Sequence, residues 1–127
     1  MTSQNIVQVS PAAILIVDDN PQNLQVLAKI LQENKYVIEF ATNGEAALVW
    51  LRDKKFDLIL LDINMPDMDG FEVCRKIRSN PAMNNVPVIF LSADTERESI
   101  LKGFEFGAQD YVTKPFDSRE LLVRVRT

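Results

Sequence analysis

Short apolar runs alternate with segments of helical periodicity along most of the chain. Four runs of strand length cover residues 14–17, 58–61, 86–91 and 110–113, and a fifth, residues 36–41, is rich in β-branched and aromatic side chains. Helical spacing or capping signals predict helices over residues 21–34, 43–52, 71–79 and 95–106, and a last one from residue 118. This order, a strand and then a helix five times over, predicts an α/β fold with a parallel sheet covered on both faces.

Capping residues mark several of the predicted helix boundaries. Asn20 precedes a proline and is expected to cap the first helix. Thr42 and Glu45 have the spacing of a capping box, and Asp117 and Glu120 have the same spacing before the last helix. Gly103 is expected to weaken the helix over residues 95–106, which ends near the next glycine.

Polar side chains follow four of the predicted strands. Asp18 and Asp19 come after the first strand, Asp62 after the third, Ser92 after the fourth and Lys114 after the fifth. The carboxyl ends of parallel strands line one edge of a sheet, which is where open α/β folds bind ligands. The sequence therefore predicts that three acids, a hydroxyl and a lysine share one crevice.

Composition and charge exclude some classes of function for this protein. The 127 residues fit one domain, and 14 basic against 18 acidic residues give a net charge of -4 and a pI near 4.8, which argues against direct nucleic-acid binding. The chain has no histidine, which excludes mechanisms that need one of its own, and its single cysteine, Cys74, cannot form an internal disulfide.

Domain organisation follows from the two ends of the chain. Residues 1–11 read as a flexible polar leader, and residues 12–127 as a single domain. The chain shows neither a signal peptide nor an apolar run of membrane-spanning length, so we expect a cytoplasmic protein without membrane association. The last helix stops without a C-cap residue, which indicates a domain excised from a longer polypeptide.

Carboxylates that lie close together repel one another and need positive charge beside them. Two of them about 4 Å apart repel by roughly 4 kcal/mol at an effective dielectric constant near 20, and Lys114 supplies a single positive charge. Mg²⁺ suits a site with oxygen ligands and accepts phosphate oxygens in its remaining positions. Asp62, which stands alone after its strand, is the expected nucleophile for a phosphoryl group, and the Ser92 hydroxyl is expected to register that group.

Four motifs together resemble the receiver domains of two-component response regulators. They are Asp18-Asp19, the stretch from Leu61 to Gly70, Leu91-Ser92-Ala93, and Tyr111-Val112-Thr113-Lys114-Pro115-Phe116. They occur in the family's order, and the similarity extends over nearly everything from Ala13 onward. The resemblance implies a flavodoxin-like fold of five βα units, with a doubly wound parallel sheet in strand order 2-1-3-4-5.

The resemblance also implies roles for the acidic residues. Asp62 would be the phosphoacceptor, and Mg²⁺, or Mn²⁺ in its place, would be held by Asp19, Asp62 and the backbone carbonyl of Asn64. Asp18 would act on the metal mainly through bound water. Residues that match Asn64 and Asp94 help to set the lifetime of the acyl phosphate in the family.

Further implied roles concern the phosphoryl group and the switch. Ser92, Ala93 and Lys114 would contact the phosphoryl group, and the Lys114-Pro115 bond would be cis. Ser92 and Tyr111 would be the switch residues, with Tyr111 swinging inward as Ser92 moves toward the phosphate.

Partners also follow from the resemblance. The donor would be a phosphohistidine on a sensor histidine kinase or a histidine phosphotransfer domain. An output domain or partner protein would read the surface formed by residues 95–106, residues 110–113 and the last helix, and a phosphorylation-dependent homodimer is a further option. The domain would catalyse its own phosphorylation and dephosphorylation and is not classed as an enzyme. The parent is either a response regulator or a hybrid histidine kinase.

Other interpretations of the same residues stay open. A haloacid-dehalogenase-type phosphatase also uses a strand-end aspartate nucleophile with Mg²⁺, but its second aspartate, two residues on, is Asn64 here. Sustained turnover of a phosphoester would identify such an enzyme. A phosphorylation-independent interaction module is the third hypothesis, and the presence of every expected acid argues against it. Asp67 and Asp69, beside a glycine, are predicted to be turn residues without chemistry.

Overall fold

The structure is a computed structural model that describes residues 11–93 and 96–126. In this part of the chain five strands alternate with five helices, as the sequence predicts. The strands are β1 (Ala13–Val17), β2 (Val37–Ala41), β3 (Leu58–Asp62), β4 (Val88–Ser92) and β5 (Asp110–Thr113). The helices are α1 (Pro21–Glu33), α2 (Gly44–Asp53), α3 (Gly70–Arg78), α4 (Arg97–Glu105) and α5 (Ser118–Arg126). Of the predicted leader, all but Pro11 lies outside the described residues.

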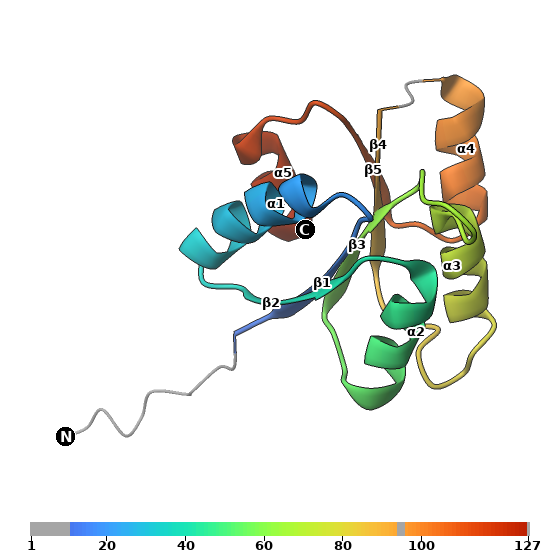
Figure 1. The fold of residues 1–127 in the computed structure, drawn as a ribbon. Coiled ribbons are helices and arrows are strands. Elements are labelled where there is room, and N and C mark those ends of the chain that lie inside the picture. Colours follow the sequence, from blue (N-terminus) through green and yellow to red (C-terminus); the bar gives the residue numbers. More distant parts are fainter. Residues whose placement is uncertain (1–10, 94–95, 127) are drawn as a thin grey trace.

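All strand pairs are parallel, and the sheet has the order β2-β1-β3-β4-β5. Figure 1 shows α1 and α5 on one face of this sheet and α2, α3 and α4 on the other. Every residue of β3 and β4 is buried, which explains why these strands are nearly continuous apolar runs in the sequence. The parallel arrangement brings the carboxyl ends of β1, β3, β4 and β5 to one edge.

Two apolar clusters hold the helices to the sheet. Successive strand residues point to opposite faces, so β1 contributes to both clusters. On one face Ile14 and Ile16 pack with apolar residues of α1 and with Leu121 of α5. On the other, Leu15 and Val17 belong to the cluster that contains the buried residues of α2 and α3. The sheet is thereby packed between two helical layers, which hold its strand ends in place.

Helix α1 begins as predicted, and α2 does not. The Asn20 side chain accepts hydrogen bonds from the backbone N–H groups of Gln22 and Asn23, and Pro21 is the first helical residue. The capping box predicted from Thr42 is wrong, because Asn43 is the N-cap and accepts from the backbone N of Ala46. Asparagine is among the strongest N-cap residues, so it competes successfully with a neighbouring threonine.

The boundaries of α3 and α4 also differ slightly from the prediction. Asp69 caps α3 by accepting from the Glu72 backbone N, which starts this helix one residue early, at Gly70. Helix α4 starts at Arg97, and the start predicted at Thr95 lies outside the described residues. Gly103 is a buried position within α4, and the helix ends at Glu105, close to the second glycine as predicted.

Cys74 is fully buried in α3, and its Sγ donates to the carbonyl of Phe106 at 3.1 Å. Burial raises the pKa of this thiol, which disfavours the reactive thiolate and agrees with the structural role expected from the sequence. Throughout the described residues, each helix is too short or too polar to cross a lipid bilayer.

Candidate functional site

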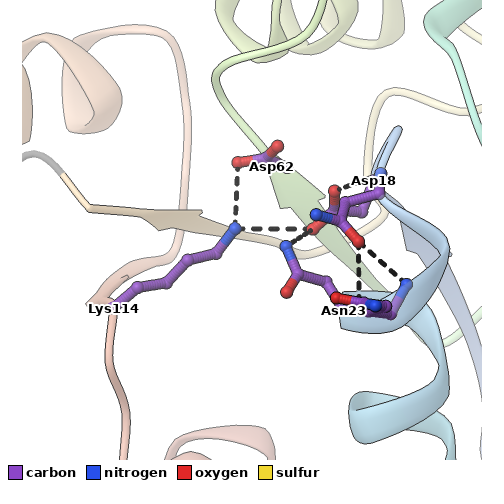
Figure 2. Close-up of polar contacts among 6 residues, drawn as sticks. Asp18, Asn23, Asp62 and Lys114 are labelled. Atoms are coloured by element: carbon purple, nitrogen blue, oxygen red, sulfur yellow. Dashed lines mark hydrogen bonds and ion pairs between the residues drawn. The ribbon is translucent and has the colours of Figure 1, made fainter.

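Three strand ends meet at the predicted edge of the sheet. Asp18 directly follows β1, Asp62 is the last residue of β3, and Lys114 directly follows β5. The Lys114 Nζ lies 3.4 Å from Asp18 Oδ2 and 3.3 Å from Asp62 Oδ1, so one ammonium bridges two carboxylates (Figure 2). The predicted convergence of these three residues is confirmed.

Asp18 is held by the start of α1 as well as by the lysine. Its side chain is buried, with Oδ1 accepting from the backbone N of Asn20 at 2.9 Å. The other oxygen, Oδ2, accepts from the Asn23 side-chain Nδ2 at 3.2 Å and from Lys114. Both oxygens of this buried carboxylate are therefore hydrogen-bonded, as a charge away from water requires.

Asp62 is also buried, with an exposed fraction of 4%. Burial raises the pKa of Asp62, the Lys114 ammonium opposes this shift, and the nearby Asp18 carboxylate adds to it. A hydrogen bond from the Asn64 backbone also favours the charged form. Asp62 is thus a carboxylate whose negative charge is poorly solvated, a state that favours reaction with an electrophile or binding of a cation.

The three acids fit a divalent cation. Asp18, Asp19 and Asp62 each offer a carboxylate oxygen, and these oxygens all lie within 4.8 Å of one another. Asp19 is exposed, whereas the other two are buried, so the cluster opens to solvent on one side. A single ammonium leaves net negative charge among them, and hard cations such as Mg²⁺ prefer such oxygen donors.

The loop after β3 folds back tightly onto the strand end. The backbone N of Gly70 donates to the carbonyl of Ile63 at 2.8 Å. A Cβ at Gly70 would lie 2.6 Å from the Asp62 carbonyl oxygen, so a glycine is needed for this approach. Asp67 has a positive φ of 67° and Asp69 caps α3, which confirms that both serve the turn.

Ser92 ends β4 beside the lysine. It pairs with Thr113 of β5, and its carbonyl accepts from the Lys114 backbone N at 2.7 Å. Ser92 is fully buried, and the adjacent Ala93 is exposed. Asp94, to which the family resemblance gives a part in acyl-phosphate lifetime, lies outside the described residues.

Tyr111 of β5 is buried, with its ring centroid 6.4 Å from that of Phe90 in an edge arrangement. Its ring therefore already packs inward in this structure. The Lys114-Pro115 peptide bond is cis, as the resemblance implies.

A mostly apolar groove adjoins the acidic cluster. Its volume is about 400 Å³, and it lies between the start of α1 and the loop that joins β5 to α5. The lining residues are Asn23, Val26, Leu27, Ala93, Lys114, Pro115 and Phe116.

Asn23 is the site residue that sequence reasoning missed. It lies five positions after Asp18, in the first turn of a helix whose N-cap was recognised. That spacing was available as a signal, because a side chain in the first turn of α1 can face back toward the strand end.

Comparison with known proteins identifies relatives over nearly the whole chain. The family model described as the response regulator receiver domain matches residues 14–126. The transcriptional regulatory protein ResD of Bacillus subtilis is 41% identical over 119 residues, which are 94% of this chain and 48% of ResD. A probable cyclic di-GMP phosphodiesterase of Vibrio cholerae is 42% identical over 127 residues, which are 100% of this chain and 29% of that protein. The chain spans less than half of the length of these relatives.

A solved structure gives the same result for the fold. The chemotaxis response regulator CheY4 of Vibrio cholerae matches with a TM-score of 0.87 and 32% sequence identity. The match covers 92% of this chain and 98% of CheY4. The flavodoxin-like fold that the resemblance implies is confirmed.

Proposed function

This chain belongs to the family of response regulator receiver domains, and from that premise we propose that Asp62 accepts a phosphoryl group from a partner's phosphohistidine. The observation that carries the proposal is the position of Asp62. It is a buried carboxylate at a strand end, bridged by Lys114 to Asp18 and next to an exposed third acid.

The transfer step follows from the groups present. An Asp62 oxygen attacks the phosphorus, and the new O–P bond forms as the N–P bond to the donor imidazole breaks. The electron pair of that bond goes to the imidazole nitrogen, which takes up a proton from solvent water. The Lys114 ammonium, 3.3 Å from Asp62 Oδ1, is close enough to stabilise negative charge on the phosphoryl oxygens.

The same residues would hold a metal ion. We assign Mg²⁺ to Asp19, Asp62 and the backbone carbonyl of Asn64, with Asp18 acting through bound water. When bound, Mg²⁺ neutralises charge on the phosphoryl oxygens in the transition state. A haloacid-dehalogenase-type phosphatase needs an aspartate two residues after its nucleophile, and this position is Asn64 here. We therefore favour transfer of one phosphoryl group to Asp62 over repeated hydrolysis of a phosphoester.

A switch completes the proposed function. Ser92, Ala93 and Lys114 would contact the phosphoryl group, and the movement of Ser92 would stabilise the inward position that the Tyr111 ring already has in this structure. Since β5 carries Tyr111, we propose that the surface of α4, β5 and α5 changes its affinity for an output domain or partner protein, or for a second copy of the chain. Two apolar residues of α4, Leu101 and Phe104, are exposed with fractions of 48% and 45%, as a protein contact would use.

Intact-mass measurement with acetyl phosphate tests this function. The wild-type chain should gain one phosphoryl group in the presence of Mg²⁺ and none in excess chelator. Asp62→Asn should gain none, whereas the control Asp67→Asn, in the same loop, should be labelled normally. Undiminished labelling of Asp62→Asn, or repeated turnover of the donor without a labelled protein, would refute the proposal.

A further inference from the structure

The start of α1 holds both oxygens of the Asp18 carboxylate. The backbone N of Asn20 donates to Oδ1 at 2.9 Å, and the side-chain amide of Asn23 donates to Oδ2 at 3.2 Å. Asn20 is the N-cap of the helix and accepts from the backbone N of Asn23 at 3.3 Å. Figure 2 shows these contacts as one network, so the orientation of Asp18 is tied to the first turn of α1.

The Asn23 amide and the Lys114 ammonium share one acceptor. Both approach Oδ2 of Asp18, the amide at 3.2 Å and the ammonium at 3.4 Å. The ammonium also lies 3.3 Å from Asp62. Without the amide, Oδ2 would depend on Lys114 alone. The carboxylate would then be held to the start of α1 by Oδ1 only, and its soft terminal torsion would allow it to turn.

We propose that Asn23 is a positioning residue of this site: its amide fixes the Asp18 carboxylate for the Mg²⁺ site. This inference rests on the proposed function, because that function requires Mg²⁺ beside Asp62. Partners of metal-site carboxylates that lie outside the coordination sphere commonly change metal affinity by roughly 10-fold or more when removed.

Asn23 is suited to a test by substitution. It is half-buried and lines the groove beside the site, outside both apolar clusters. Asn23→Leu keeps the size of the side chain and removes the donor, and Asn23→Ala removes the donor with a residue that favours helix formation. Gln25→Leu, on an exposed position of the same helix, is the matched control.

Isothermal titration calorimetry with Mg²⁺ measures the effect directly and needs no phosphoryl donor. Both Asn23 variants should bind Mg²⁺ roughly 10-fold more weakly than the wild type, and Gln25→Leu should bind it normally. The Mg²⁺ concentration for half-maximal labelling by acetyl phosphate should rise by the same factor. The labelling rate at saturating Mg²⁺ should stay within about twofold of the wild type. Loss of folding would lower this rate together with the Mg²⁺ affinity, whereas loss of the Asn23 amide should lower the affinity alone.

Two results would overturn the inference. One is Mg²⁺ affinity within about twofold of the wild type in both folded variants. The other is a lower rate at saturating Mg²⁺ with unchanged affinity, which would place Asn23 at the donor rather than at Asp18. Thermal melts in chelator establish that each variant is folded at the temperature of the titration. If the wild type takes up no phosphoryl group, the proposed function fails, whereas the calorimetric comparison still decides the role of Asn23.

Discussion

Gly103 of α4 lies directly against Tyr111 of β5, so that a Cβ at Gly103 would be 3.1 Å from Cδ2 of the Tyr111 ring. The same Cβ would be 3.0 Å from Cδ2 of Phe90. Helix α4 therefore rests on two aromatic rings at the position where it has no side chain. A displacement of the Tyr111 ring would therefore require α4 to shift. Such a shift is a route by which a change at the strand end reaches the proposed output surface.

Substitution of this glycine tests the close packing. Gly103→Ala gains about 1 kcal/mol in helix propensity, but overpacking of a core contact costs typically 1–3 kcal/mol. We expect a net loss on the order of 1 kcal/mol in the free energy of unfolding, measured by urea denaturation. Glu105→Ala, on an exposed position of the same helix, should change little. A stabilised Gly103→Ala variant would show that the two rings yield easily and do not fix α4.

The Ser92 hydroxyl is expected to transmit the presence of the phosphoryl group. A ligand shifts a two-state surface through contacts that differ between its states, and Ser92 is buried beside Lys114. With fluoroberyllate as a phosphoryl mimic, hydrogen exchange should change from residue 93 to residue 111 in the wild type and much less in Ser92→Ala. That variant should still accept phosphate.

Ser79→Ala is the matched control for this measurement, because Ser79 is an exposed hydroxyl at the end of α3. It should respond to fluoroberyllate like the wild type. Equal responses from Ser92→Ala and the wild type, or changes that gather at α1 and α2, would contradict this route of coupling.

The sequence predicts the meeting of Asp18, Asp62 and Lys114 because it depends on two simple properties. Each of these residues follows an apolar run, and parallel strands bring such positions to one edge. The sequence does not predict that Asp18 is buried and Asp19 exposed. Adjacent side chains at a strand end point in opposite directions, and the sequence does not say which of the two points inward.

The role of Asn23 could not be predicted with the same ease. Its contact with Asp18 depends on how the first turn of α1 is rotated about the helix axis, and tertiary packing decides that rotation. The N-cap of α2 was mispredicted for a related reason. Thr42 and Asn43 can both cap a helix, and local spacing does not distinguish them when both are followed by helical residues.

Neutralising the acidic cluster should stabilise the metal-free protein. Burial raises the pKa of Asp62, so the native state binds its proton more tightly than the unfolded chain does. The free energy of unfolding should therefore fall as pH rises from the ordinary value of 3.8 through the higher native pKa. Asp62→Asn removes this cost and should add on the order of 1 kcal/mol at pH 7 in chelator.

The same measurement separates the members of the cluster. Asp19→Asn should also raise metal-free stability, but by less, because Asp19 is exposed and its repulsion is screened. Both variants should bind Mg²⁺ more weakly. Asp53→Asn, an exposed position at the end of α2, is the control and should leave thermal melts unchanged with and without Mg²⁺. A destabilised Asp19→Asn variant would mean that Asp19 serves chiefly to stabilise the helix start.

Arg78, the last residue of α3, joins three segments through its guanidinium. It donates to the Gly107 carbonyl from Nε at 3.2 Å and from Nη2 at 2.7 Å. Its Nη1 donates to the carbonyls of Asn84 at 3.1 Å and Val86 at 2.7 Å. The turn after α4, where Gly107 has a φ of +95°, is thereby tied to the segment before β4.

Removing this guanidinium should destabilise the fold without impairing phosphoryl transfer. Arg78→Leu leaves three carbonyl groups to find new partners, so we expect a loss of about 2–3 kcal/mol in urea denaturation. Arg75→Leu is the matched control, because Arg75 pairs with Glu72 at the surface of the same helix and such pairs contribute little. Acetyl phosphate should label both variants normally, because Arg78 lies at the end of α3 away from Asp62. Equal stability of the two variants would contradict the structural role of Arg78, and loss of labelling in Arg78→Leu alone would instead link this anchor to the site.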